Sequence, residues 1–367
     1  MAADTQKKKS SRKKWGLLIA GIVLLVIVGI VCMVGMPWIR WYLDGSTPDT
    51  PVAAPAEGVQ TNAFDFDTRT VLLNNGVEMP IYGIGTYNLT PEEAEESVYW
   101  ALEAGARLID TAHAYNNEEG VGRGIQRAIE DGIVTRDEIF VTTKLWMDDY
   151  SEEGIEERLE RLNLDYIDLL LIHQPQGNYT RAWELMEQYY NDGKLRAIGL
   201  SNFSDEQFAE LAAEAEVIPA VLQVETHLHN QQVAMKGFLN QYGTVLEAWF
   251  PLGGRGNTST YLTDETVNAI ADAHGKSAAQ VILRWHLQDG HIAIPGSHNP
   301  DHIRENTELF DFELTDEEMA QLRALNLNEA YFSMIGQTSD DTQERYGTES
   351  SDVQEDTEQQ QETQTDN

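Results

Sequence analysis

The chain has 367 residues and a formal net charge of −36, from 25 Lys and Arg against 61 Asp and Glu. Such an acidic chain repels nucleic-acid phosphates, so we exclude nucleic acid as a partner. Cys32 is the single cysteine and lies in an apolar N-terminal run, so the rest of the chain has no disulfide, thiolate metal site or thiol nucleophile. No metal centre is expected.

The N-terminal residues have the pattern of a membrane anchor. Residues 1–14 hold six Lys and Arg against Asp4, and the 21 residues 16–36 carry no charge. That length spans a bilayer, and tryptophans on both sides suit its interfaces. Residues 15–42 are therefore predicted to form a single transmembrane helix. The alternative is a cleaved signal peptide, but its apolar core would be about 7–15 residues long with small residues close behind.

Composition divides the remainder of the chain into three parts. Residues 43–67 are rich in Pro, Ala, Thr and acidic side chains, which predicts a flexible linker. Residues 336–367 are acidic and almost without apolar side chains, which predicts a disordered tail. The part between them, 68–335, is long enough for one barrel of about 250 residues.

Strand-like and amphipathic helical runs alternate within 68–335, which predicts an α/β fold with a parallel sheet. A hairpin is expected over 70–78 and a first strand over 81–85. The first helix is expected over 91–104, because Thr90 suits its N-cap position. Further helices are predicted over 118–130, 151–162, 180–191, 206–215, 231–240, 264–274, 278–288, 300–309 and 317–325, and a last strand over 292–294.

Six of the predicted strands end in polar or aromatic side chains. In a (β/α)8 barrel the carboxyl ends of the strands meet on one face, where the chemistry takes place. These side chains are therefore expected to lie together. They are Asp110, Lys144, His173, Ser201, Asn202, Gln223 and Trp249.

Several segments resemble the signatures of the aldo-keto reductases, a family of NAD(P)H-dependent carbonyl reductases, and in particular its bacterial-type members. The resemblance covers residues 70–330, and the segments follow in the family's order. It implies a (β/α)8 TIM barrel with an N-terminal hairpin. The segments are GARLIDTAHAYNNEEGVG (105–122), LIHQP (171–175), GKLRAIGLSNF (193–203), LQVETH (222–227), EAWFPLG (247–253) and IPGSHNPDHIREN (294–306).

The resemblance implies a catalytic tetrad of Asp110, Tyr115, Lys144 and His173. Tyr115 would be the general acid. A phenol with a pKa of about 10 needs a neighbour that eases proton loss, and Lys144 would supply that charge while Asp110 holds the lysine. His173 would orient the carbonyl oxygen or relay a proton at low pH. Each residue alone has an ordinary structural explanation, but four in the family's order favour catalysis.

The resemblance also implies a nicotinamide dinucleotide, NADP(H) with NAD(H) as the alternative. Gly296 and His302 stand where the family often has Lys and Arg, the cations that bind the 2′-phosphate of NADPH, so the preference stays open. Trp249 would stack on the nicotinamide ring and leave one ring face to the substrate. The implied cofactor-binding residues are Ser201, Asn202, Gln223, Trp249, Leu252, Gly253, Ser297, His302, Glu305 and Asn306. The implied substrate-binding residues are Tyr87 and Gln174.

The predicted function is reduction of small aldehydes or ketones to alcohols by a monomer held on the membrane through residues 15–42. One alternative is a non-catalytic module that binds a dinucleotide and senses redox state, which a turnover assay would separate. The other is an ene-reductase variant, which in this family has Glu in place of His173.

The charge distribution also predicts an orientation in the cell membrane. Basic residues before the span and acidic residues after it place the N-terminus in the cytoplasm and the barrel outside. A reductase outside lacks an obvious supply of reduced dinucleotide, whereas one held inside has it. A large domain that folds before translocation overrides the charge bias, so the inner face is the alternative.

Overall fold

The computed structural model describes residues 62–332. The predicted basic segment 1–14, anchor 15–42 and tail 336–367 lie outside the described residues, as does most of the linker 43–67. Among residues 62–332, no helix combines the length and the apolar character needed to cross a membrane.

Eight parallel strands follow one another around a barrel in chain order, which confirms the predicted (β/α)8 fold. The first and last strands close the ring, because the Ala293 N–H donates to Ile81 O at 3.1 Å and the Gly85 N–H donates to Pro295 O at 3.2 Å. The strands are β4 (Gly83–Gly85), β5 (Leu108–Asp110), β6 (Phe140–Leu145), β7 (Ile167–Ile172), β8 (Leu195–Ser201), β9 (Val221–Glu225), β10 (Val245–Trp249) and β11 (His291–Ala293).

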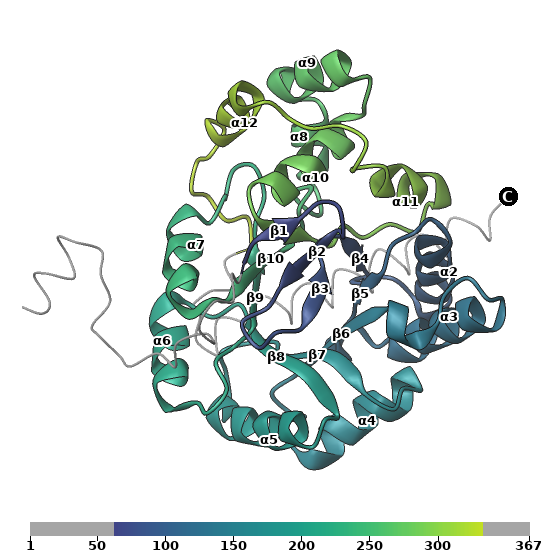
Figure 1. Ribbon diagram of the computed structural model, residues 1–367, viewed down its shortest axis with the longest axis vertical. Helices are drawn as coiled ribbons and strands as arrows, with labels where there is room; N and C mark the ends of the chain where they lie inside the picture. The colour runs from purple at the N-terminus through teal and green to yellow at the C-terminus, as the bar shows by residue number, and fades with distance from the viewer. Residues whose placement is uncertain (1–61, 333–367) are drawn as a thin grey trace, which may run out of the picture. The chain divides into compact units, whose positions relative to one another are not determined.

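Helices surround the strands, and the strands β1 to β3 cross the middle of the ring in the view of Figure 1. Thr90 caps the first helix as predicted, and Ser204 and Thr315 cap two later helices; each side chain accepts a backbone N–H. The helices are α2 (Pro91–Glu103), α3 (Glu118–Glu130), α4 (Glu152–Leu162), α5 (Tyr179–Asn191), α6 (Asp205–Glu214), α7 (Val233–Leu239), α8 (Thr258–Leu262), α9 (Glu265–His274), α10 (Ala278–Gln288), α11 (Pro300–Thr307) and α12 (Asp316–Arg323).

An antiparallel sheet of β1 (Phe64–Asp65), β2 (Thr70–Leu72) and β3 (Glu78–Pro80) closes one end of the barrel. β2 and β3 form the predicted hairpin, and β1 falls within the range predicted as linker. Asn74 at the hairpin turn donates through Nδ2 to Pro219 O at 3.1 Å, just before β9 begins. The hairpin therefore covers the end where the strands begin and leaves the opposite face to the strand ends.

The barrel strands are buried on both faces, as expected for strands between a filled interior and an outer layer of helices. Every residue of β6 and β7 is buried. Within β7, Leu169 and Leu171 belong to one apolar cluster, whereas Leu170 and Ile172 belong to another. This alternation means that every second side chain of a strand points into the barrel. Inward-pointing polar side chains of neighbouring strands therefore lie close together in the barrel interior.

Candidate active site

The strand ends bring the four predicted catalytic residues together. Asp110 is the last residue of β5, Lys144 lies one residue before the end of β6, and His173 directly follows β7. Tyr115 ends η1 (His113–Tyr115), a short 3-10 helix that follows β5. Three neighbouring strands and one adjoining turn thus supply the whole group.

The Lys144 ammonium is fully buried and uses all three of its N–H donors. Its Nζ lies 2.6 Å from Asp110 Oδ1, 2.9 Å from Thr111 O and 3.2 Å from the Tyr115 hydroxyl. Asp110 is 2% exposed, so this is a buried ion pair with hydrogen bonds on both partners. The lysine is therefore held in one position beside the phenol.

Burial dominates the ionisation of the phenol. It raises the pKa of Tyr115 well above its ordinary value, and the negative charge of Asp110 raises that pKa further. Burial also raises the pKa of Asp110, while the charge of Lys144 opposes that rise. Tyr115 is therefore protonated at neutral pH.

His173 is neutral and packed between aromatic rings. Its ring centroid lies 5.6 Å from that of Tyr115 and 5.0 Å from that of Trp146, in edge-on geometry with both. Burial lowers the pKa of His173 well below its ordinary value, and the charge of Lys144 lowers it further. The imidazole is therefore uncharged at neutral pH.

Four predicted cofactor residues lie beside the tetrad: Ser201 and Trp249 end β8 and β10, Asn202 directly follows β8, and Gln223 lies inside β9. Asn202 has a left-handed backbone (φ 64°), which turns its side chain back toward the site. Its Nδ2 donates to His173 O at 3.0 Å and to Ser201 Oγ at 3.1 Å, and its Oδ1 accepts from Trp249 Nε1 at 3.0 Å. Gln223 is 1% exposed and donates to Asp110 Oδ2 at 2.8 Å.

The loop after β10 has several residues in left-handed backbone conformations. Gly253, Gly254 and Gly256 all have positive φ, and a Cβ on Gly253 would lie 2.2 Å from Tyr261 Cε2. Phe250 also has a positive φ of 51°, which is uncommon for a bulky residue and marks local strain. Leu252, which is half-buried, and Gly253, which is buried, lie in this loop as predicted.

The predicted adenosine end lies at the start of α11. His302 is exposed and Asn306 is buried, with Ser297 and Glu305 half-buried. The nearby Arg304 pairs with Asp301 at 3.2 Å and lines a hollow against α2. That arginine therefore already has a carboxylate partner.

Aromatic side chains form the wall on the substrate side. The Tyr87 ring is 42% exposed and lies 5.1 Å from that of Tyr115 and 5.7 Å from that of Phe250. Phe332 packs 5.1 Å from Phe250. Gln174, by contrast, is 1% exposed, which limits its contact with any ligand.

Trp146, Phe250 and Phe332 were not singled out from the sequence. For Phe250 the sequence offered one indication, because the residue lies within the segment EAWFPLG, next to Trp249. Phe332 lies far along the chain from the other aromatics, and no local pattern indicates its place.

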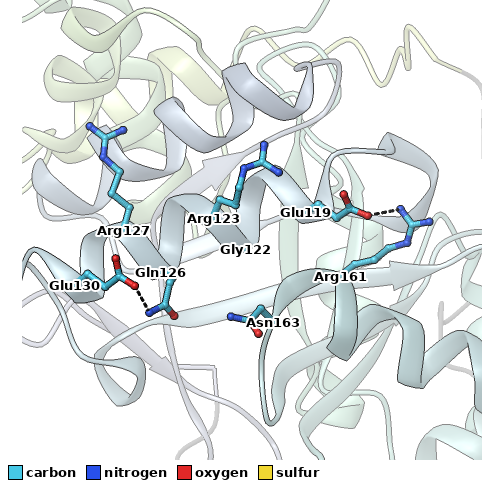
Figure 2. Close-up of a pocket in the computed structure, with 8 residues that line it drawn as sticks. All are labelled: Glu119, Gly122, Arg123, Gln126, Arg127, Glu130, Arg161 and Asn163. Carbon is cyan, nitrogen blue, oxygen red and sulfur yellow. Dashed lines mark hydrogen bonds and ion pairs between the residues drawn. The ribbon is translucent and has the colours of Figure 1, made fainter.

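A separate hollow lies on the outer wall between α3 and α4 (Figure 2). It measures about 380 Å³ and is lined by three arginines. The pairs are Arg123 with Glu95 at 2.6 Å, Arg127 with Glu96 at 2.8 Å and Arg161 with Glu157 at 2.6 Å. Because each guanidinium already has a carboxylate partner, this hollow does not rival the strand-end site.

Known proteins resemble the chain over most of the described part. The model of the Aldo/keto reductase family matches residues 81–327. Glyoxal reductase of Bacillus subtilis is 46% identical over 266 residues, covering 71% of this chain and 94% of the relative. Morphine 6-dehydrogenase of Pseudomonas putida is 44% identical over 270 residues, covering 69% and 90%. The crystal structure of a Bombyx mori aldo-keto reductase in complex with NADP is 37% identical with a TM-score of 0.68, covering 72% and 94%.

Proposed function

Because the chain belongs to the aldo/keto reductase family, we propose that it reduces small aldehydes and ketones to alcohols with a reduced nicotinamide dinucleotide. The observation that carries this proposal is the buried chain of contacts from Asp110 through Lys144 to the Tyr115 hydroxyl. The relatives named glyoxal reductase and morphine 6-dehydrogenase support carbonyl and alcohol chemistry.

The side chains of the site divide the work of the reaction. The dinucleotide supplies a hydride to the carbonyl carbon when bound. Tyr115 donates its proton to the carbonyl oxygen, and Lys144, which already donates to the phenol oxygen, stabilises the phenolate that remains. The neutral His173 donates a hydrogen bond that orients the same oxygen.

The residues around the tetrad fit a nicotinamide dinucleotide. Ser201, Asn202 and Gln223 are buried polar groups beside the tetrad, suited to a carboxamide. Trp249 would stack on the ring, and the glycine-rich loop from Gly253 follows the seventh barrel strand, β10, where barrels commonly bind phosphate. The family and the NADP-bound structural relative favour NADP(H).

Weak discrimination between NADPH and NADH is expected, because Gly296 and His302 offer no permanent cation for the 2′-phosphate. We expect Gly296→Lys to shift the ratio of kcat/KM values toward NADPH by about tenfold, since a new ammonium meets the phosphate. Steady-state kinetics with both dinucleotides measures the shift.

Two further variants control for the backbone at Gly296, where an added Cβ would lie 3.0 Å from Gly85 O. Gly296→Met adds a side chain without charge and should leave the ratio unchanged. His302→Arg adds a cation at an exposed position and should shift the ratio in the same direction. A wild-type protein that strongly prefers NADPH, with no response to either cation, would show that other donors bind the phosphate.

A panel of small aldehydes and ketones assayed with both dinucleotides tests the proposed reaction itself. Consumption of reduced dinucleotide that depends on a carbonyl compound supports the reductase. Tight dinucleotide binding without turnover on any member would favour the alternative, a non-catalytic redox-sensing module.

We also propose that residues 15–42 anchor the protein as a single-pass membrane protein, with the barrel outside. The basic cluster before the apolar run and the acidic residues after it support this orientation. Protease added to intact cells should then remove the barrel. If the barrel is digested only after the membrane is broken, it faces the cytoplasm, and if it is released without detergent, the anchor is absent.

A further inference from the structure

A buried carboxylate lies next to the proposed cofactor site without a part in the tetrad. Glu247 is in the middle of β10, pairs in register with Gln223 of β9, and is 0% exposed. An uncharged residue would fill this interior position at lower cost, because burying a carboxyl group is unfavourable unless it has partners. The partners of Glu247 therefore indicate its role.

Gln223 joins Glu247 to the tetrad. Its Nε2 donates to Asp110 Oδ2 at 2.8 Å and to Glu247 Oε2 at 2.8 Å. A side-chain amide has two N–H donors on its nitrogen, so these two carboxyl groups use both. The amide oxygen of Gln223 is then the group that remains for a ligand.

The two acceptors also prevent the amide from turning over. A half-turn about its last bond would place the amide oxygen against the oxygens of Asp110 and Glu247, where it would meet acceptors in place of donors. Asp110 is already held by Lys144 at 2.6 Å, so it cannot move away. With Glu247 absent, only one of the two restraints would remain.

We propose that Glu247 is a positioning residue that, together with Asp110, fixes the Gln223 amide so that its oxygen faces the carboxamide of the nicotinamide. This inference rests on the proposed function, because it requires a nicotinamide dinucleotide in the site. An amide oxygen accepts from the carboxamide N–H and repels a carboxylate. The site should therefore distinguish NADP⁺ from its nicotinic acid analogue, in which a carboxylate replaces the carboxamide.

The carboxyl group of Glu247 also interacts electrostatically with the catalytic groups. Asp110 from β5, Lys144 from β6 and Gln223 from β9 all act on it, and burial followed by the charge of Asp110 raises the pKa of Glu247 to about 8. Below that pH the carboxyl group is mostly protonated and Oε2 still accepts from Gln223. Above it, the new negative charge raises the pKa of Tyr115 further and makes the phenol a weaker acid. Carbonyl reduction should therefore slow above about pH 8.

The test compares dissociation constants of the full-length protein for NADP⁺ and for its nicotinic acid analogue. Wild type should bind NADP⁺ more tightly, and Glu247→Leu should reduce that preference by about tenfold, the effect of one lost hydrogen bond in a buried site. Affinity for 2′,5′-ADP, which has no nicotinamide, should not change. Thr142→Val is the matched control, because Thr142 is fully buried in β6 and its hydroxyl has no hydrogen-bond partner among the described residues.

Two more variants separate positioning from a general effect on folding. Glu247→Gln keeps an acceptor oxygen and should keep the preference, but it cannot ionise and should lose the decline in kcat/KM above pH 8. Adding Glu247→Leu to Gln223→Leu should change the preference no further, because Glu247 acts through Gln223.

The inference is overturned if Glu247→Leu keeps the wild-type preference, or if Glu247→Gln, which retains the acceptor oxygen, loses it. Binding is measured without turnover, so a protein that binds NADP⁺ but reduces no carbonyl compound refutes the proposed function and leaves the preference to decide the role of Glu247.

Discussion

Tyr115→Phe is expected to lower kcat for carbonyl reduction by a factor of about 10² or more. The substitution keeps the ring that packs against Tyr87 and His173 but removes the proton that the carbonyl oxygen must receive. Dinucleotide affinity should stay within about twofold of wild type, since the phenol is not among the groups assigned to the cofactor. Steady-state kinetics and dinucleotide titration measure the two effects separately.

Tyr99→Phe provides the control for Tyr115→Phe. Its hydroxyl donates to Asp131 Oδ2 at 2.9 Å on the outer wall, so the same atom is removed far from the site. That variant should retain wild-type turnover. Near-normal turnover of Tyr115→Phe would show that another group protonates the carbonyl oxygen.

Lys144→Met should lower turnover and also destabilise the fold. Turnover should fall by a factor of about 10² or more, because the phenolate left on Tyr115 loses its ammonium neighbour. The free energy of unfolding should fall by about 3–5 kcal/mol, because Asp110 is left buried without its ionic partner. Denaturant unfolding and kinetics on the same preparation measure both.

The double variant Lys144→Met/Asp110→Asn distinguishes the two effects. Removing the carboxylate as well leaves no uncompensated charge, so most of the lost stability should return. Turnover should stay low, because the ammonium is still absent. If activity returned together with stability, Lys144 would have only a structural role.

The sequence could predict those helices and strands whose apolar residues recur at a regular spacing. The helices predicted over 118–130 and 278–288 have these bounds in the structure, because apolar residues recur at helical spacing. Ser277 also caps the second of them. The barrel followed from the alternation of elements, and the closeness of the tetrad followed from the barrel. These are local patterns combined with one rule of topology.

Such local patterns could not predict contacts between distant parts of the chain. The bond from Gln223 to Asp110 joins residues 113 positions apart, and its second acceptor, Glu247, was part of a signature without an assigned role. β9 continues to Glu225, so Gln223 lies inside the strand and not at its end. The raised pKa of Tyr115 was missed because it depends on burial, which no neighbour in the sequence reveals.

The helix α8 was also missed. Its segment, Thr258–Leu262, follows glycines and contains threonine and serine, which are typical of loops. Tyr261 is 1% exposed, and its hydroxyl lies 2.9 Å from His227 Nδ1. Tertiary packing of this tyrosine therefore holds a short helix that local propensity does not favour.

Transfer of a deuterium label tests the central claim, hydride transfer to a carbonyl carbon at this site, most directly. Wild-type protein would reduce an aldehyde from the panel with NADPH labelled at one of its two C4 positions, and the alcohol would be examined by mass spectrometry. With Trp249 against one face of the nicotinamide ring, deuterium should reach the alcohol carbon from one labelled form and not from the other. An alcohol without deuterium from either form would contradict hydride transfer, and equal labelling from both would contradict the stacked cofactor.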